Sequence, residues 1–82
     1  MITANDIQQF IQTHLPEAQV SVEGEDGHHF TAVVIADSFA GLSPVKRQQM
    51  VYATLGDRLQ TGEIHALALK TLTPDEWKIT QQ

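Results

Sequence analysis

The spacing of apolar residues predicts a helix at the start of the chain. Thr3 is a suitable N-cap, and Asp6, three positions on, completes a capping box that marks where the helix begins. Pro16 ends the predicted helix, because the residue before a proline is driven away from helical dihedral angles. The apolar residues between these signals share one helical face: Ile7, Phe10, Ile11 and Leu15.

Alternating apolar and polar positions predict two strands after this helix. Val20 and Val22 alternate with polar neighbours, which is typical of a strand with one solvated face. Residues 30–36 are almost continuously apolar, as expected for a central strand that is covered more completely. Residues 24–29 lie between the two strands and contain two glycines, a composition typical of turns. The two strands are therefore expected to form an antiparallel hairpin.

A second helix is predicted from Ser43 to Thr61–Gly62. Ser43 is a good N-cap, and Pro44 has the fixed dihedral angle that the first helical position requires. Thr61–Gly62 is the expected stop signal. The apolar residues of this segment are expected to form a buried stripe: Val45, Val51, Tyr52, Leu55 and Leu59.

A third strand and a last helix complete the predicted fold. Residues 64–72 form an apolar segment suited to a strand, and Thr73, Pro74 and Glu76 then repeat the start signals of a helix. We expect Trp77 to pack this helix onto the sheet. The second and third strands are joined by a helical crossover, which allows them to be parallel. The order indicates an α+β fold with helices on one face of a three-stranded sheet.

Composition and charge narrow the possible functions of this chain. No repeat or linker divides the sequence, so residues 1–82 are expected to form a single domain. Ten acidic and five basic residues give a net charge of −5, which disfavours binding to nucleic acid. The chain has no cysteine. No apolar stretch suggests a signal peptide or a membrane span, so we expect a cytoplasmic protein without membrane contact.

Four histidines are the candidates for ligand or proton-transfer chemistry. His14 ends the first predicted helix and is expected to be a surface residue. His28 and His29 adjoin the hairpin turn, and because neighbouring strand residues point to opposite faces, only one of them is expected to aim at a given site. His65 shares its strand face with leucines, so it is either a partly buried histidine bonded to the backbone or a ligand for zinc, copper or iron.

Two histidines on separate elements are too few for a closed metal site, so a metal centre would need ligands from another molecule. Other catalytic arrangements lack support, because no serine lies in a nucleophile-elbow context. The acidic residues of the hairpin turn suit a solvated loop rather than an acid–base pair: Glu23, Glu25 and Asp26. These observations do not indicate an enzyme.

Taken in order, four segments of the chain resemble the BolA family. They are residues 39–43, 46–52, 64–67 and 71–77, and their spacing is like that of the family over nearly the whole chain. The similarity is greatest to a small bacterial branch that has no cysteine. This resemblance implies a fold like that of type II KH domains, with the order α-β-β-α-β-α, room for an extra short helix, and a three-stranded mixed sheet with helices on one face.

The resemblance also implies a function and a partner. Members of the BolA family form heterodimers with monothiol glutaredoxins, often bridged by a 2Fe–2S cluster to which the glutaredoxin and glutathione contribute thiolates. By this resemblance the chain is a non-enzymatic adaptor in iron–sulfur cluster assembly, trafficking or iron sensing. The family's carboxyl-proximal histidine matches His65. Its variable second ligand lies in the hairpin loop and corresponds here to His28 or His29, with His28 favoured. A homodimer is a further possibility when the partner is absent.

The predicted second helix departs from the family pattern. Many relatives carry Arg-His-Arg where this chain has Arg47, Gln48 and Gln49, so a histidine and a positive charge are missing. The glycine-rich signature loop of KH domains is also absent, since residues 41–44 lack its second glycine. A nucleic-acid-binding transcriptional regulator linked to stress response, as proposed for some relatives, is therefore the alternative function.

Overall fold

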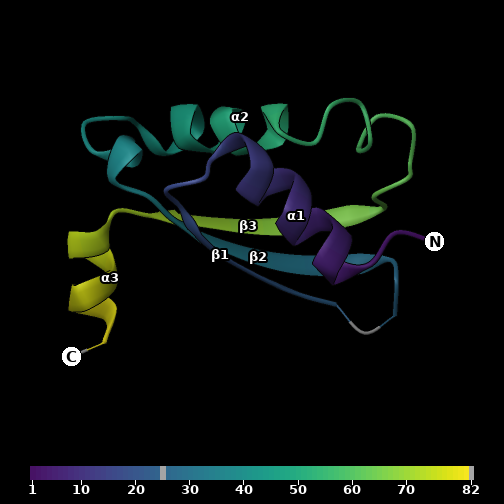
Figure 1. Cartoon of the computed structure of the whole chain (residues 1–82), viewed down its shortest axis with the longest axis horizontal. Helices are drawn as coiled ribbons and strands as arrows, with labels where there is room; N and C mark the ends of the chain where they lie inside the picture. The colour runs from purple at the N-terminus through teal and green to yellow at the C-terminus, as the bar shows by residue number, and fades with distance from the viewer. Residues whose placement is uncertain (25, 82) are drawn as a thin grey trace.

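Helices and strands follow one another in the predicted order, with one extra short helix (Figure 1). The computed structural model describes residues 1–24 and 26–81, so Glu25 of the predicted turn and Gln82 at the end of the predicted domain lie outside the described residues. The elements are α1 (Ala4–His14), β1 (Gln19–Glu23), β2 (His29–Ile35), the 3-10 helix η1 (Asp37–Phe39), α2 (Pro44–Ala53), β3 (Ala66–Leu72) and α3 (Pro74–Thr80).

The three strands form one mixed sheet in the order β1-β2-β3. β1 and β2 pair antiparallel, with Gln19 opposite Ile35, which confirms the predicted hairpin. β2 and β3 run parallel, with His29 opposite Ala66 at one end and Ile35 opposite Leu72 at the other. The α+β fold class with a three-stranded mixed sheet is thus confirmed.

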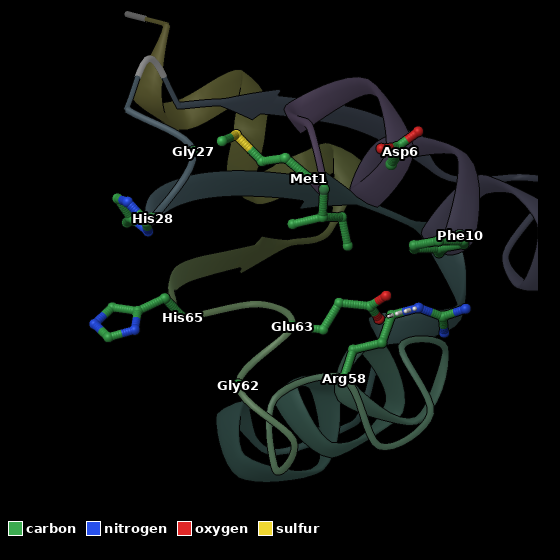
Figure 2. A pocket seen from close by; sticks show the side chains of 10 residues that line it. Met1, Asp6, Phe10, Gly27, His28, Arg58, Gly62, Glu63 and His65 are labelled. Carbon is green, nitrogen blue, oxygen red and sulfur yellow. Dashed lines mark ion pairs between the residues drawn. The ribbon is translucent and has the colours of Figure 1, made fainter.

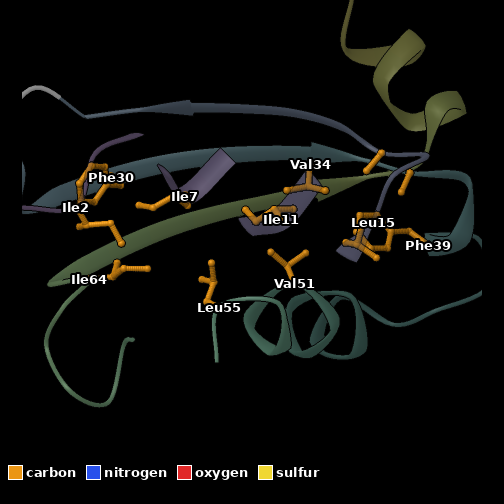
Figure 3. Packing of buried hydrophobic residues seen from close by; sticks show 12 residues of the cluster. Ile2, Ile7, Ile11, Leu15, Phe30, Val34, Phe39, Val51, Leu55 and Ile64 are labelled. Carbon is orange, nitrogen blue, oxygen red and sulfur yellow. The ribbon is translucent and has the colours of Figure 1, made fainter. Parts of the chain in front are cut away.

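One face of the sheet carries the core, and α1 and α2 cover it (Figures 1 and 3). Alternate residues of β2 point into this core, and every second one from Phe30 to Val34 is buried. The largest fully buried side chains come from both helices, the 3-10 helix and the connections: Ile7, Ile11, Phe39, Val51, Leu55 and Ile64. The two longer helices therefore lie on one face, as predicted.

The third helix, α3, lies on the other side of the sheet, beside its end, so the prediction of helices on one face is correct for α1 and α2 but wrong for α3 (Figure 1). Trp77 of α3 lines a shallow hollow together with Val33 and Ile35, whose side chains point away from the core. β2 is apolar on both faces at this end, so a large side chain is needed to cover the second face. Trp77 does so only in part, since it stays 37% exposed.

The helix starts are the predicted ones. Thr3, Ser43 and Thr73 each accept a hydrogen bond from a backbone N–H in the first turn of their helix. The carboxylates of Asp6 and Glu76 accept the backbone N–H of their N-cap residue, at 2.9 Å and 2.8 Å. Both predicted capping boxes are therefore present. These signals act over a few residues and depend little on the rest of the fold.

The predicted end of the second helix at Thr61–Gly62 is wrong, because α2 ends at Ala53. Gly56 adopts a positive φ of 61°, which takes the backbone out of the helix, and a series of turns follows. Leu55 is still buried and Leu59 packs against the core from these turns. The apolar spacing that indicated a longer helix is therefore produced by non-helical backbone.

Among the described residues, no helix is long and apolar enough to cross a membrane.

The predicted burial of Val45 is also wrong, since 63% of this residue is exposed. Val45 precedes the fully buried Val51 by six positions, which is about one and two-thirds helical turns. The two side chains therefore leave α2 about 120° apart around the helix axis, and only Val51 faces the core.

A two-pronged ion pair joins α2 to the start of α3. The Arg47 guanidinium donates to both carboxylate oxygens of Glu76, at 2.7 Å and 3.3 Å, and its Nε donates to the carbonyl oxygen of Leu42 at 3.0 Å. The Thr73 N–H also donates to Glu76. The Arg47 hydrogen bond, and after it the Thr73 N–H, lower the pKa of Glu76 below its usual 4.5. The Glu76 carboxylate thus caps the start of α3 and also links α3 to α2.

Replacing Glu76 with glutamine is expected to lower the melting temperature at neutral pH by several degrees. A depressed pKa in the folded state stabilises the protein above pH 4.5, and this contribution is lost as the pH falls through the folded-state value. The difference between wild type and E76Q should therefore shrink on acidification. Thermal unfolding followed by circular dichroism at about pH 7 and about pH 3 tests this, with E23Q, on exposed Glu23, as the charge-matched control. A difference that stays constant with pH would contradict the assignment.

Candidate functional site

The amino-terminal ends of β2 and β3 bring three histidines to one corner of the molecule. Because parallel strands start at the same edge of a sheet, the residues that precede them become neighbours. The Ala66 N–H donates to the carbonyl oxygen of His28 at 3.0 Å, and His29 lies opposite Ala66 in the ladder. His65 is the residue just before Ala66, so its side chain lies beside those of His28 and His29.

The imidazole rings of this corner lie in edge-to-face pairs. The His65 ring centroid is 5.9 Å from that of His28 and 5.7 Å from that of His29, with interplanar angles of 76° and 86°. Both hairpin-loop rings thus approach His65, so the expectation that only one of them aims at a given site is wrong. Strand alternation does not separate them, because His28 lies in the bend before β2.

His65 is exposed, which excludes the predicted alternative of a partly buried histidine bonded to the backbone. β3 begins at Ala66, two residues later than predicted, so His65 stands outside the row of leucines in the strand. Within the described residues, its ring makes no hydrogen bond. The ligand role predicted for His65 is therefore compatible with its position.

The Asp26 carboxylate anchors the hairpin loop. The sequence had suggested only a solvated loop residue at this position. Asp26 Oδ1 accepts the backbone N–H groups of His28 and His29, both at 2.9 Å. His29 Nδ1 lies 2.8 Å from Asp26 Oδ2. The His29 side chain, followed by the two N–H groups, holds the pKa of Asp26 well below its usual range. The available signal was the short spacing from aspartate to histidine in a turn, where such side chains commonly bond nearby backbone N–H groups.

A groove of about 730 Å³ runs beside His28 and His65 (Figure 2). Two of its charged side chains are paired with each other: Arg58 Nε donates to Glu63 at 3.1 Å, and the guanidinium lies 3.9 Å from the centre of the Phe10 ring. Asp6, which also lines the groove, accepts the backbone N–H of Thr3. These residues were not predicted to belong to the site, because the segment around Arg58 was expected to be helical.

Among the described residues, the histidines of the corner do not make a complete metal site. Within residues 1–24 and 26–81, no group of three or more histidine, aspartate, glutamate or cysteine side chains is arranged to hold a metal ion. His14 lies at the far end of α1, where its Nδ1 is 3.0 Å from the carbonyl oxygen of Phe10, and takes no part in this corner. A metal ion bound by these exposed imidazoles would need further ligands from another molecule.

Comparison with known proteins identifies the family. Residues 5–76 match the family model described as BolA-like protein. The chain is 40% identical over 73 residues to the acid stress protein IbaG of Escherichia coli (strain K12), covering 89% of this chain and 86% of that protein. It is 46% identical over 54 residues to the DNA-binding transcriptional regulator BolA of Vibrio cholerae, covering 66% and 50% respectively.

The fold comparison agrees with the sequence comparison. The structure of a bolA protein homologue from Coxiella burnetii superposes with a TM-score of 0.83 and 51% sequence identity, covering 95% of this chain and 99% of that one. Both the matched sequence and the matched fold extend from α1 to α3. On these grounds the chain belongs to the BolA-like family.

Proposed function

We propose that this chain is a non-enzymatic adaptor in iron–sulfur cluster assembly, trafficking or iron sensing, which shares a 2Fe–2S cluster with a monothiol glutaredoxin and glutathione. The observation that carries the proposal is the group of exposed imidazoles at the start of β2 and β3. His65 is one ligand in this proposal, and His28 or His29 is the second.

The chemistry of the donors suits such a cluster. Two histidines can replace two thiolates on one iron of a 2Fe–2S cluster, and this replacement raises its reduction potential. The chain has no cysteine, so any thiolates must come from the partner and from glutathione. When bound, the cluster would supply one-electron and cluster-transfer chemistry, while the chain supplies two nitrogen ligands and their orientation.

The position of the rings also suits a shared site. All three are exposed at a corner of the fold, so a partner can reach them without any unfolding of this chain. Arg58 and Glu63 of the groove are already paired with each other, which lowers the cost of covering these two charges with another protein. An exposed, incomplete donor set is the arrangement that two proteins need in order to complete one metal centre together.

Reconstitution of a monothiol glutaredoxin with iron, sulfide and glutathione tests the proposal. Adding this chain is expected to change the visible absorption and circular dichroism of the cluster, because nitrogen ligands replace sulfur ligands. Native mass spectrometry should detect a heterodimer that carries the cluster, and the same measurement on the chain alone reports any homodimer. Unchanged spectra together with the absence of a heterodimer would refute the adaptor function.

A nucleic-acid-binding transcriptional regulator is the second candidate, favoured by the name of the Vibrio cholerae relative. The charge distribution supports it poorly. The net charge is −5, and Arg47 and Arg58 are both paired with carboxylates. A titration with duplex DNA at low and high salt separates the two functions, since binding through phosphate contacts weakens steeply as salt increases.

A further inference from the structure

We infer that Asp26 is a positioning residue that fixes His29 as the second ligand beside His65. This inference rests on the proposed function, in which the choice between His28 and His29 was left open. The contacts of Asp26 with the hairpin loop carry it, and they hold the two histidines in different ways.

Asp26 binds His29 at two points and His28 at one. Its Oδ1 accepts the backbone N–H groups of both histidines at 2.9 Å, which fixes the path of the loop. Its Oδ2 lies 2.8 Å from Nδ1 of His29, so the ring of this residue is held as well as its backbone. Within the described residues the His28 ring has no hydrogen-bond partner, and ordering it on a metal would cost rotational entropy that His29 has already lost.

The Asp26 contact also decides which nitrogen of His29 carries the hydrogen. Asp26 is exposed, so at neutral pH its side chain is a carboxylate and can only accept hydrogen bonds. Nδ1 of a neutral His29 must therefore donate, and Nε2 keeps the lone pair that a metal needs. Histidine ligands in proteins commonly donate their other ring N–H to a carboxylate, and loss of that partner typically lowers metal affinity by about 10–100-fold.

The distances between the rings do not make this choice. His28 and His29 lie 5.9 Å and 5.7 Å from the His65 ring centroid, a difference too small to favour either. His28 and His65 both line the groove, whereas His29 lines a separate hollow next to Thr31. The difference between them is the carboxylate behind His29, which His28 lacks.

The variant D26N tests the positioning role with little change in shape. The asparagine carbonyl can still accept a backbone N–H, but its amide donates to Nδ1 of His29, which moves the ring hydrogen to Nε2. Long-range ¹H–¹⁵N NMR of the imidazoles should show the hydrogen on Nδ1 in the wild type and on Nε2 in D26N. Calorimetric titration with Ni²⁺ alone should show an affinity lower by about 10-fold or more. D57N removes an equal charge from an exposed turn and should match the wild type in both measurements.

The ligand choice is tested with H29A and H28A. The Ni²⁺ affinity and the glutaredoxin-dependent spectral change should both be lost in H29A and kept in H28A. Two results would overturn the inference while the adaptor function stands. One is that the Ni²⁺ affinity and the spectral change are lost in H28A but kept in H29A. The other is that Nε2 of His29 carries the hydrogen in the wild type. If instead the wild type never alters the glutaredoxin spectrum, the adaptor function fails. The NMR and Ni²⁺ measurements need no partner and still decide whether Asp26 positions His29.

Discussion

Replacing His65 with alanine is expected to abolish the spectral change that this chain produces in a glutaredoxin-bound cluster. The substitution removes one of two nitrogen donors, and a single remaining imidazole cannot hold the iron against the competing thiols of glutathione. Visible circular dichroism of the reconstituted mixture measures the effect. The variant H14A is the matched control, because it removes an exposed histidine from the far end of α1 and should leave the spectrum of the complex unchanged.

The same substitution should have little effect on stability. His65 is exposed, and its ring makes no hydrogen bond within the described residues, so H65A is expected to change the free energy of unfolding by no more than about 0.5 kcal/mol. A lost spectral change in a fully folded variant therefore reports on the ligand and not on the fold. A spectrum in the presence of H65A identical to that with the wild type would show that His65 is not a ligand.

Replacing Phe39 with alanine is expected to be the most destabilising of the changes considered. Phe39 is fully buried in the core, and truncation of a buried phenylalanine typically costs about 3–5 kcal/mol. A domain of 82 residues has a total stability of about 4–12 kcal/mol, so F39A would lose a large share of it. The midpoint and slope of urea unfolding, followed by far-ultraviolet circular dichroism, measure the loss.

The variant F39L separates the effect of volume from that of position. Leucine fills most of the space left by the aromatic ring, so F39L should lose clearly less stability than F39A. A loss below about 1 kcal/mol in F39A would contradict the burial of Phe39, because that value is less than the transfer free energy of the atoms removed.

The parts of the fold that depend on neighbouring residues were predictable from the sequence. Thr3, Ser43 and Thr73 begin their helices as expected, because a cap needs only a side-chain oxygen and a backbone N–H a few residues away. The hairpin of β1 and β2 followed in the same way from alternation around a turn with two glycines.

Features that depend on packing over longer distances were harder to predict. The end of α2 was missed because Leu55 and Leu59 keep a helical spacing after the helix has ended at Ala53. The position of α3 on the other face of the sheet was missed because the apolar run of residues 30–36 indicates cover on both faces but does not show which helix supplies it. In both cases side chains from other elements determine the outcome.

The candidate site also combines features that the sequence indicated with features that depend on contacts between distant segments. The family resemblance indicated His65 and the hairpin loop, but it left His28 and His29 as alternatives. Their distances to His65 follow from the register of the parallel pair, with His29 opposite Ala66, which no local pattern reveals. The role of Asp26 depends on hydrogen bonds that form only once the loop has its final conformation.

The pairing of His29 with Ala66 in the β2–β3 ladder means that the proposed ligand site exists only in the folded chain. The donors come from opposite ends of the segment that contains β2, η1 and α2, and an unfolded chain does not hold them together. Any molecule that binds both donors must therefore stabilise the native state, by about 2.7 kcal/mol at a free concentration 100 times its Kd. In such a small domain this gain approaches the loss expected from truncating one core side chain, so a partner in excess would rescue folding of weakened variants.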